Sequence, residues 1–394
     1  MRTEPQAAAA SMLTSVPPEL LTWLEQRHGT GSASAARAQL VMREGVGRGR
    51  SLVQQTVHLP ATFDGPQQYA VRIAGPHGDW IARATGDERL REVRLREALG
   101  RSLPAPLRMA ILDVLPLGDG RVLLIEPPLP NPGTESVAQS LAAVRALARL
   151  HTGCATFPAR LTATLGLVPL GAWLTLYAPH TGVREAALHG EASTPDDLPS
   201  RLQPGWNAFT ERAPEAWRAL APLLSDPAPL VRALRSCPET LLHGSPSAAV
   251  VRVSVSMSVP VPVVDGSAPV VLHDWRQALR APGALDLATF LAASVMERSD
   301  ATPAPALAPA PAPAPEELIE AYRMARAEGG RLPASGERWE RELTLALLAG
   351  ALRVGWAVAG ADEAVLNFWS DAALAGVALL RLDVEGEGVD ESGA

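Results

Sequence analysis

Three short segments hold the side chains of this chain that could do chemistry. They read Leu-Leu-His-Gly-Ser-Pro-Ser-Ala-Ala-Val at 241–250, Val-Val-Leu-His-Asp-Trp at 270–275 and Ala-Leu-Asp-Leu-Ala-Thr-Phe-Leu at 284–291. Asp274 and Asp286 carry carboxylates, which can hold a hard cation or accept hydrogen bonds from a loop. Ser245 has no usable basicity near neutral pH, so it cannot serve as a general base.

The order of these segments resembles the catalytic core of the aminoglycoside phosphotransferase / choline kinase-like family. His-Gly, Asp-Trp and Leu-Asp-Leu-Ala follow one another as they do in that family, and the set is more specific than any single piece. The resemblance spans roughly residues 40–300, with a looser match of helices to 383. It implies a protein-kinase-like fold, phosphoryl transfer to a small hydroxylated or amino compound, and Mg-ATP as cofactor.

In that family the first segment reads His-Gly-Asp, with an asparagine five residues after the aspartate. This chain keeps His243 but has Ser245 at the position of the aspartate that orients or deprotonates the acceptor hydroxyl. Val250 stands at the position of the metal-binding asparagine, and an apolar side chain cannot ligate Mg²⁺. The resemblance therefore assigns the catalytic loop to His243 and Ser245 and predicts that its chemistry is degraded.

Two further aspartates have counterparts in the family. Asp274 matches the principal Mg²⁺ ligand, and the alternative is an aspartate that only forms a turn. Asp286 matches a helix-start aspartate that supports the catalytic loop through hydrogen bonds. Asp265 could substitute for a lost carboxylate, but its place before Gly266 favours a hairpin turn.

The resemblance also assigns a nucleotide-binding side, beginning with a glycine loop. Gly45, Gly47 and Gly49 lie between two predicted strands. Glycine lacks a Cβ, so backbone amides in such a loop can approach a phosphate. The alternative is a plain hairpin loop.

Three charged residues complete that side. Arg83, in Trp80-Ile-Ala-Arg-Ala, falls where the family has its strand lysine, unless it is a surface residue on an edge strand. Glu92 resembles the helix glutamate that pairs with that lysine; Glu97 is the competing register, and a solvated helix face is the alternative. Glu126 falls on the strand that meets the adenine ring through its backbone.

Composition excludes several classes of function. The net charge of −7 over 394 residues gives no strong positive field, so we predict no nucleic-acid partner. All 35 basic residues are arginine, so a mechanism that needs a lysine ammonium is excluded. Two cysteines give no disulfide framework and no cysteine-based metal site.

The apolar segments predict a cytoplasmic protein. The N-terminal apolar run is short and rich in alanine, so we predict no secretory signal. Residues 343–361 approach the length of a membrane span, but Arg353 at their middle would be costly in hydrocarbon. This segment favours a buried helix, and no membrane partner is predicted. A protein partner stays unknown.

Hydrophobic periodicity divides the chain into a strand-rich first part and a helical second part. The predicted strands cover 38–42, 52–59, 69–73, 80–84, 109–115 and 122–126, with later strands within 250–272. The predicted helices cover 18–27, 88–99, 136–151, 209–236 with breaks at Pro227 and Pro229, 316–329 and 336–383.

We therefore predict an α+β, two-lobed protein-kinase-like fold with a small antiparallel-sheet N-lobe and a larger helical C-lobe. The predicted units are an N-terminal extension (1–38), the N-lobe (39–130), the C-lobe (131–383) with a Pro/Ala loop at 302–315, and an acidic tail (384–394).

Three functions stay open from the sequence. The first is a catalytically impaired, pseudokinase-like phosphotransferase that binds a nucleotide or a small molecule. The second is an active ATP-dependent phosphotransferase that uses Asp274 and a single Mg²⁺. The third is a non-catalytic interaction protein whose pocket is filled by its own side chains.

Overall fold

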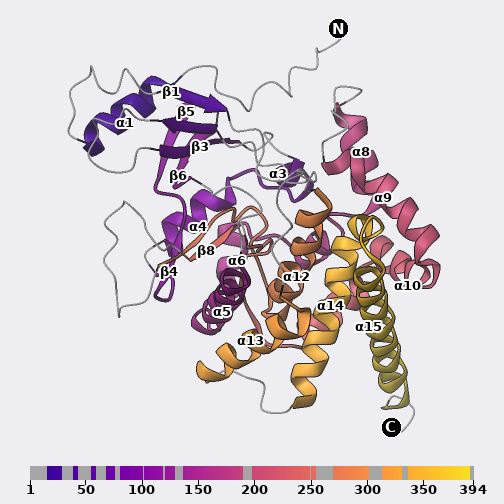
Figure 1. Cartoon of the computed structure of the whole chain (residues 1–394). Helices are drawn as coiled ribbons and strands as arrows, with labels where there is room; N and C mark the ends of the chain where they lie inside the picture. The colour runs from indigo at the N-terminus through magenta and orange to yellow at the C-terminus, as the bar shows by residue number, and fades with distance from the viewer. Residues whose placement is uncertain are drawn as a thin grey trace.

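The computed structural model describes residues 16–28, 39–42, 55–58, 68–75, 80–100, 102–118, 120–128, 136–189, 198–248, 250–253, 269–300, 313–330 and 336–390 (Figure 1). Three predicted features fall outside these residues. They are the loop of Gly45, Gly47 and Gly49, the Asp265-Gly266 turn, and most of the Pro/Ala loop.

A five-stranded antiparallel sheet forms the N-terminal part. In spatial order its strands are β1 (Gln39–Met42), β2 (Gln55–His58), β3 (Gln68–Ala74), β6 (Arg121–Glu126) and β5 (Asp113–Gly118). Helix α1 (Pro18–His28) packs against this sheet, and Trp23 meets Tyr69 edge-on with ring centroids 5.2 Å apart. Leu20 and Leu24 of α1 are fully buried. The segment predicted as an extension therefore contributes a helix to the core of the sheet.

The predicted strand over residues 80–84 is wrong, because Trp80–Ala84 form the short helix α3. A run of consecutive apolar residues fits a buried helical turn as well as a strand. Packing decides between them: Trp80 contacts the ring of Tyr177 in the helical part, with centroids 5.7 Å apart.

The predicted helix over residues 88–99 is present and begins slightly later, as α4 (Arg91–Leu99). Leu90 has a left-handed backbone with φ of 55°, which cannot continue a helix. Asp87 accepts the N–H of Arg91 on both carboxylate oxygens, at 3.0 and 2.9 Å. This contact satisfies a helix-end donor and fixes where α4 starts.

Two small sheets connect the N-terminal part to the helical part. Strands β4 (Leu107–Met109), β9 (Val270–Leu272) and β8 (Val251–Val253) form one sheet, in which β4 and β9 are parallel. The other pairs β7 (Glu239–Leu242) with β10 (Leu279–Pro282), antiparallel. These pairings place the end of β7 beside the residues that follow β9.

Helices form the remainder. They are α5 (Val137–Gly153), α6 (Arg160–Leu165), α7 (Leu170–Leu174), α8 (Pro179–His189), α9 (Leu198–Arg212), α10 (Pro214–Ser225), α11 (Ala228–Arg235), α12 (Ala284–Asp300), α13 (Pro315–Glu328), α14 (Gly336–Val358) and α15 (Glu363–Asp390). Ser136 and Gln139 form a capping box at the start of α5. The break predicted at Pro227 is present, since α11 begins directly after it. The break predicted at Pro229 is wrong, because Pro229 lies in the first turn of α11, where proline is tolerated.

Helix α14 lies at the centre of the helical part, beside α12 and α15 (Figure 1). The predicted buried helix around Arg353 is confirmed, because most of α14 is inaccessible to solvent. The predicted span 336–383 is two helices, and α15 continues to Asp390, inside the predicted tail. Length and composition would let one helical segment of the described chain, Glu363–Leu382, cross a membrane, a test that core helices of soluble proteins also pass.

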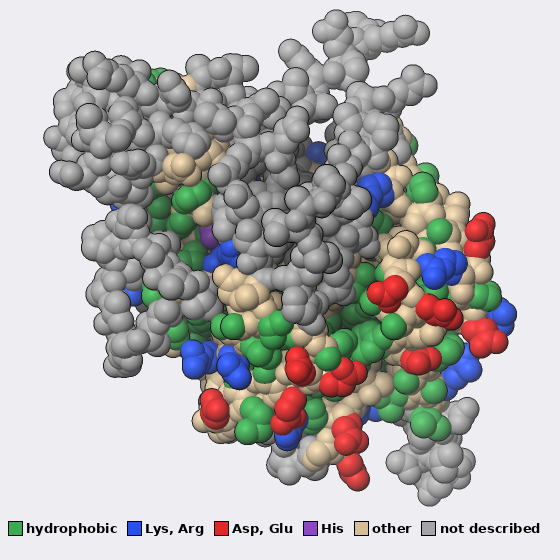
Figure 2. All heavy atoms as spheres, viewed as in Figure 1, with side chains coloured by type: hydrophobic (Ala, Val, Ile, Leu, Met, Phe, Trp, Pro, Cys, Tyr) green, Lys and Arg blue, Asp and Glu red, His purple; other side chains and the backbone are tan. Residues whose placement is uncertain are grey.

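The α+β class is confirmed: a small antiparallel sheet comes first and a larger helical part follows. On the face drawn in Figure 2, acidic and basic side chains are interspersed over the described helical part. This face therefore carries no broad field of one sign among the residues shown in colour.

Candidate functional site

A buried aspartate holds the loop that follows β7. The carboxylate of Asp286, in the first turn of α12, accepts hydrogen bonds from the backbone N–H groups of His243 and Gly244, both at 2.8 Å. Its Oδ2 also lies 3.0 Å from Nε2 of His151, whose Nδ1 is 2.7 Å from the Tyr322 hydroxyl. Asp286 is fully buried. Several N–H bonds to one buried carboxylate fix the loop relative to α12.

His243 is a buried imidazole that joins this loop to the segment after β9. Burial lowers the pKa of His243, although Asp286 nearby opposes that shift, so the ring is neutral at neutral pH. Its Nε2 donates to the carbonyl oxygen of His273 at 2.5 Å. Nδ1 then accepts a long bond, 3.4 Å, from the N–H of Ser245. The ring also packs against Trp275, with centroids 5.0 Å apart.

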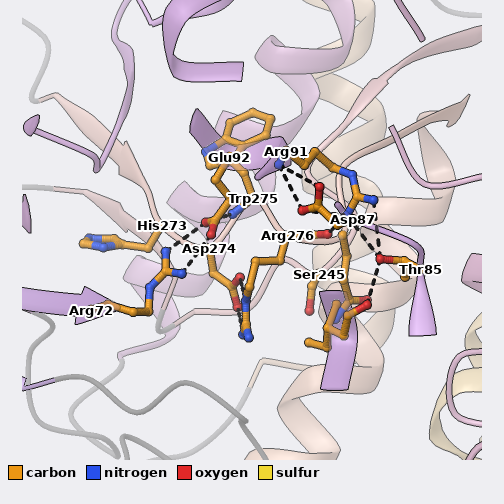
Figure 3. Close-up of polar contacts among 12 residues, drawn as sticks. Arg72, Thr85, Asp87, Arg91, Glu92, Ser245, His273, Asp274, Trp275 and Arg276 are labelled. Atoms are coloured by element: carbon orange, nitrogen blue, oxygen red, sulfur yellow. Dashed lines mark hydrogen bonds and ion pairs between the residues drawn. The ribbon is translucent and has the colours of Figure 1, made fainter. Parts of the chain in front are cut away.

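Asp274 follows β9 after one intervening residue, His273, and forms an ion pair with a neighbouring arginine. Nε and Nη2 of Arg276 donate to Oδ1 and Oδ2 of Asp274 at 2.7 and 3.0 Å (Figure 3). Both side chains are buried. Burial alone would raise the pKa of Asp274, but Arg276, with Arg72 as a further cation, holds it well below its ordinary value. Asp274 is thus an ionised carboxylate with both oxygens bound by a guanidinium.

A second ion pair lies next to the first and centres on Arg72 in β3. Its Nη1 and Nη2 donate to Glu92 at 2.8 and 3.0 Å, and Nη2 also donates to Glu126 at 3.1 Å. Glu92 is buried in the first turn of α4, whereas Glu97 is exposed. The prediction that Arg83 provides the strand cation paired with Glu92 is therefore wrong, since Arg72 occupies that place.

Arg83 contacts a different part of the molecule. Its Nε and Nη2 donate to Oε2 of Glu185 at 3.1 and 2.8 Å. Glu185 belongs to α8 and is buried, so this ion pair ties α3 to the helical part. A role for Arg83 in nucleotide binding stays a prediction, as does that of the glycine loop, which lies outside the described residues.

Glu126 and Glu92 differ in charge environment although both contact Arg72. Burial opposes ionisation of Glu126, but Arg72 and His273 together lower the pKa of Glu126 from 4.5 to about 2. Oε2 of Glu126 lies 3.6 Å from Nδ1 of His273. Burial raises the pKa of Glu92, with Asp274 adding to the rise and Arg72 opposing it. Oε1 of Glu92 accepts the N–H of Trp275 at 2.9 Å (Figure 3). The predicted backbone contact of Glu126 with an adenine ring is not tested by these contacts.

These shifts predict that the protein loses stability in acid. Glu126 and Asp274 have depressed pKa values in the folded state. Their contribution is therefore present above the pKa of the unfolded chain and is lost as pH falls toward the folded value. Glu126 contributes up to about 3 kcal/mol to the free energy of unfolding. This contribution is fully present above a pH of about 4.5 and is lost as the pH falls toward about 2.

Urea denaturation at neutral pH and at a pH of about 3 measures this loss. The raised pKa of Glu92 acts in the opposite direction and reduces the slope. The free energy of unfolding of Glu126→Gln should depend less steeply on pH than that of the wild type over the same interval. If the free energies of unfolding of the wild type and Glu126→Gln change equally with pH, the ionised Glu126 carboxylate contributes nothing to stability.

Arg353, another buried arginine, binds the segment after β9 that also contains Asp274 and Arg276. Arg353 donates through Nη2 to Oε1 of Gln277 at 2.6 Å and through Nη1 to the carbonyl of Trp173 at 3.2 Å. Its guanidinium also lies over the rings of Trp173 and Tyr177, 4.1 and 4.5 Å from their centroids. Burial lowers the pKa of Arg353, and Tyr177 and Asp286 oppose that shift.

The residues around Asp274 do not fit Mg²⁺. That ion requires oxygen ligands in near-octahedral geometry, and both oxygens of Asp274 accept hydrogen bonds from Arg276. Val250, at the position of the family's second ligand, is apolar and 3% exposed. In the described part of the chain no group of three His, Cys, Asp or Glu side chains could hold a metal ion.

Sequence reasoning placed His243, Asp274 and Asp286 around one loop but missed Arg72 and Arg276. A signal existed for Arg72: it is the single cation within the apolar strand Tyr-Ala-Val-Arg-Ile. Arg276 had no distinguishing signal, because a charged residue two positions after an aspartate is ordinary on a surface. Its burial follows only from the packing of the segment after β9.

Among the comparisons with known proteins, only the one with solved structures found similar proteins. No protein-family model matches the sequence, and no curated protein matches it. The structure is similar to a choline kinase from Cryptosporidium parvum, at 10% identity and a TM-score of 0.47, covering 95% of this chain and 98% of that one.

Two further solved structures are similar in the same way. One is a macrolide 2'-phosphotransferase from Brachybacterium faecium (20% identity, TM-score 0.39, 90% of this chain and 98% of that one). The other is an ethanolamine kinase from Plasmodium vivax (12% identity, TM-score 0.42, 91% and 86%). These similarities concern the fold.

Proposed function

We propose that this chain is a phosphotransferase-like protein of kinase-like fold that is catalytically impaired, and that it binds a nucleotide or another small molecule without transferring a phosphoryl group. The observation that carries the proposal is the ion pair in which Arg276 binds both carboxylate oxygens of Asp274. Asp274 is the residue that the sequence resemblance assigns as the principal Mg²⁺ ligand.

Phosphoryl transfer depends on metal ions that neutralise phosphate charge and on a group that orients the acceptor hydroxyl. Ser245 offers no base, and loss of an acid–base group alone costs about 10² to 10⁴ in rate. Val250 offers no metal ligand, and Asp274 is bound by Arg276. These losses concern separate requirements of the reaction, so together they leave little transition-state stabilisation.

An active enzyme using Asp274 and Mg²⁺ would require Arg276 to leave Asp274. Arg276 is 5% exposed, and its carbonyl oxygen accepts a hydrogen bond from Nη1 of Arg91. Release of the side chain would leave two buried charges without their partner, which is strongly unfavourable. This geometry supports the impaired protein over the active one.

The test is phosphoryl transfer from labelled ATP and GTP to aminoglycosides, macrolides, choline and ethanolamine. We expect wild type and Asp274→Asn to show the same rate as a sample without protein, with an active choline kinase as the positive control. In an enzyme that used this carboxylate for metal binding, the substitution would abolish transfer.

Transfer by the wild type that Asp274→Asn abolishes would overturn the proposal. Calorimetry on the same samples measures binding of the nucleotides and acceptors. Binding without transfer supports the proposal, whereas no binding of any of them supports a protein that acts only through other macromolecules.

A further inference from the structure

We infer that Arg276 takes the place of a divalent cation, so that the wild-type protein does not bind Mg²⁺ or Mn²⁺ at Asp274 and removal of Arg276 creates a divalent-cation site there. This inference rests on the proposed function and deepens it. It states what occupies the position where a catalytic metal would be expected.

The geometry of the ion pair resembles a chelate. Two N–H groups of one planar guanidinium meet the two oxygens of Asp274, at 2.7 and 3.0 Å. Arg276 lies only two residues after Asp274, so the pair forms within one short segment and needs no other element to move. The arrangement saturates the carboxylate face that would otherwise offer oxygen ligands to a hard cation.

The charge balance of the surroundings explains why a cation is needed there. Three buried carboxylates, Glu92, Glu126 and Asp274, face two guanidinium groups, Arg72 and Arg276. Without Arg276 the balance becomes three carboxylates to one guanidinium. Buried charge that lacks a partner is costly, so the vacated position would favour another cation.

Glu92 is the carboxylate that would share such an ion with Asp274. Its Oε1 accepts the N–H of Trp275, the residue after Asp274, at 2.9 Å, so the Glu92 carboxylate lies beside the segment that carries Asp274. Figure 3 shows the Glu92 carboxylate between Arg72 and the segment that carries Asp274. Two oxygen-bearing groups with water completing the shell are a common way to hold Mg²⁺ or Mn²⁺.

Arg276 is also anchored from a second side. Nη1 of Arg91 donates to its carbonyl oxygen, and the N–H of the preceding Trp275 donates to Glu92 at 2.9 Å. The backbone on which Arg276 sits is therefore tied to α4. A free divalent ion would have to displace a buried guanidinium from a fixed segment, which is why we expect the wild type to exclude it.

The test measures Mn²⁺ binding to the full chain. Electron paramagnetic resonance detects the free ion, and thermal unfolding measures the effect of binding on stability. We expect no saturable binding to wild type at millimolar Mn²⁺. Arg276→Gln should gain a site at least about tenfold tighter than any wild-type binding, because the substitution leaves Asp274 without its counter-charge. Mn²⁺ and Mg²⁺ should then raise the unfolding temperature of Arg276→Gln and leave that of the wild type unchanged.

Three matched variants give the controls. Arg276→Lys keeps a cation beside Asp274 and should gain no site. Asp274→Asn combined with Arg276→Gln should lose the gained site. Arg83→Gln breaks a different ion pair, to the buried Glu185 of α8, and should bind no Mn²⁺.

Saturable Mn²⁺ binding to the wild type that Asp274→Asn removes would overturn the inference, and this measurement needs no variant at position 276. A folded Arg276→Gln that gains no site would also overturn it. Phosphoryl transfer by a wild-type protein that does not bind Mn²⁺ at Asp274 would contradict the proposed function and leave this inference intact. Mn²⁺ binding at Asp274 of the wild type without phosphoryl transfer would contradict this inference and leave the proposed function intact.

Discussion

Replacing Asp286 by asparagine should lower the free energy of unfolding by about 3 to 5 kcal/mol, because it removes a fully buried charge that several donors share. The carboxylate accepts the N–H groups of His243 and Gly244 and contacts His151. Asparagine has a single acceptor oxygen, so its NH₂ group would face a backbone N–H. Two donors would then oppose each other in the interior, where neither can reach water.

Urea denaturation of Asp286→Asn against wild type measures the loss. Asp362→Asn is the matched control, since Asp362 is exposed and accepts the N–H of Val365 at 2.9 Å at the start of α15. Asparagine serves as well as aspartate at a helix start, so this variant should stay within about 0.5 kcal/mol of wild type. Equal effects of the two substitutions would mean that Asp286 does not hold the loop.

Gly244→Ala should cost at least about 3 kcal/mol of stability, since it combines backbone strain with a clash. Gly244 has φ of 85°, which L-residues with a Cβ rarely adopt. A Cβ at this position would lie 2.6 Å from the carbonyl carbon of Gln277 and nearer still to its oxygen. The carbonyl belongs to backbone that Arg353 and Tyr177 hold through the Gln277 side chain, so it cannot easily move.

Gly86→Ala separates the two causes. Gly86 has φ of 63° and nothing within 4 Å of an added Cβ, so only strain applies. We expect it to cost about 1 to 2 kcal/mol. In urea denaturation, the free energy of unfolding of Gly244→Ala should therefore be clearly lower than that of Gly86→Ala. If the two variants are equally stable, the close packing of the loop against Gln277 is not present in solution.

Much of the fold could be predicted because long periodic segments report their own structure. The amphipathic pattern of α5 was sufficient, because it runs over 17 residues. The short apolar run Trp80–Ala84 was not, since five residues fit one strand or one helical turn. Contact with Tyr177, almost a hundred positions later, settles which of the two forms.

The candidate site shows the same division between local and distant information. His243 and Asp286 could be related by the order of the segments that contain them. The choice between Arg72 and Arg83 as partner of Glu92 could not be made from the sequence. The signal at Arg72, a single cation in a short apolar segment, is shared by Arg83. Only the pairing of β3 with β6, which brings Glu126 to the same guanidinium, distinguishes them.

The burial of Arg353 has a consequence for how the helical part assembles. Its charge is acceptable only when Trp173, Tyr177 and Gln277 surround it together. Trp173 and Tyr177 come from one segment, and Gln277 comes from another that is far away along the chain. A partly assembled form in which α14 has docked but one of them is missing would bury an uncompensated guanidinium. Such forms are therefore scarcely populated, and the helical part should gain and lose its structure as one cooperative unit.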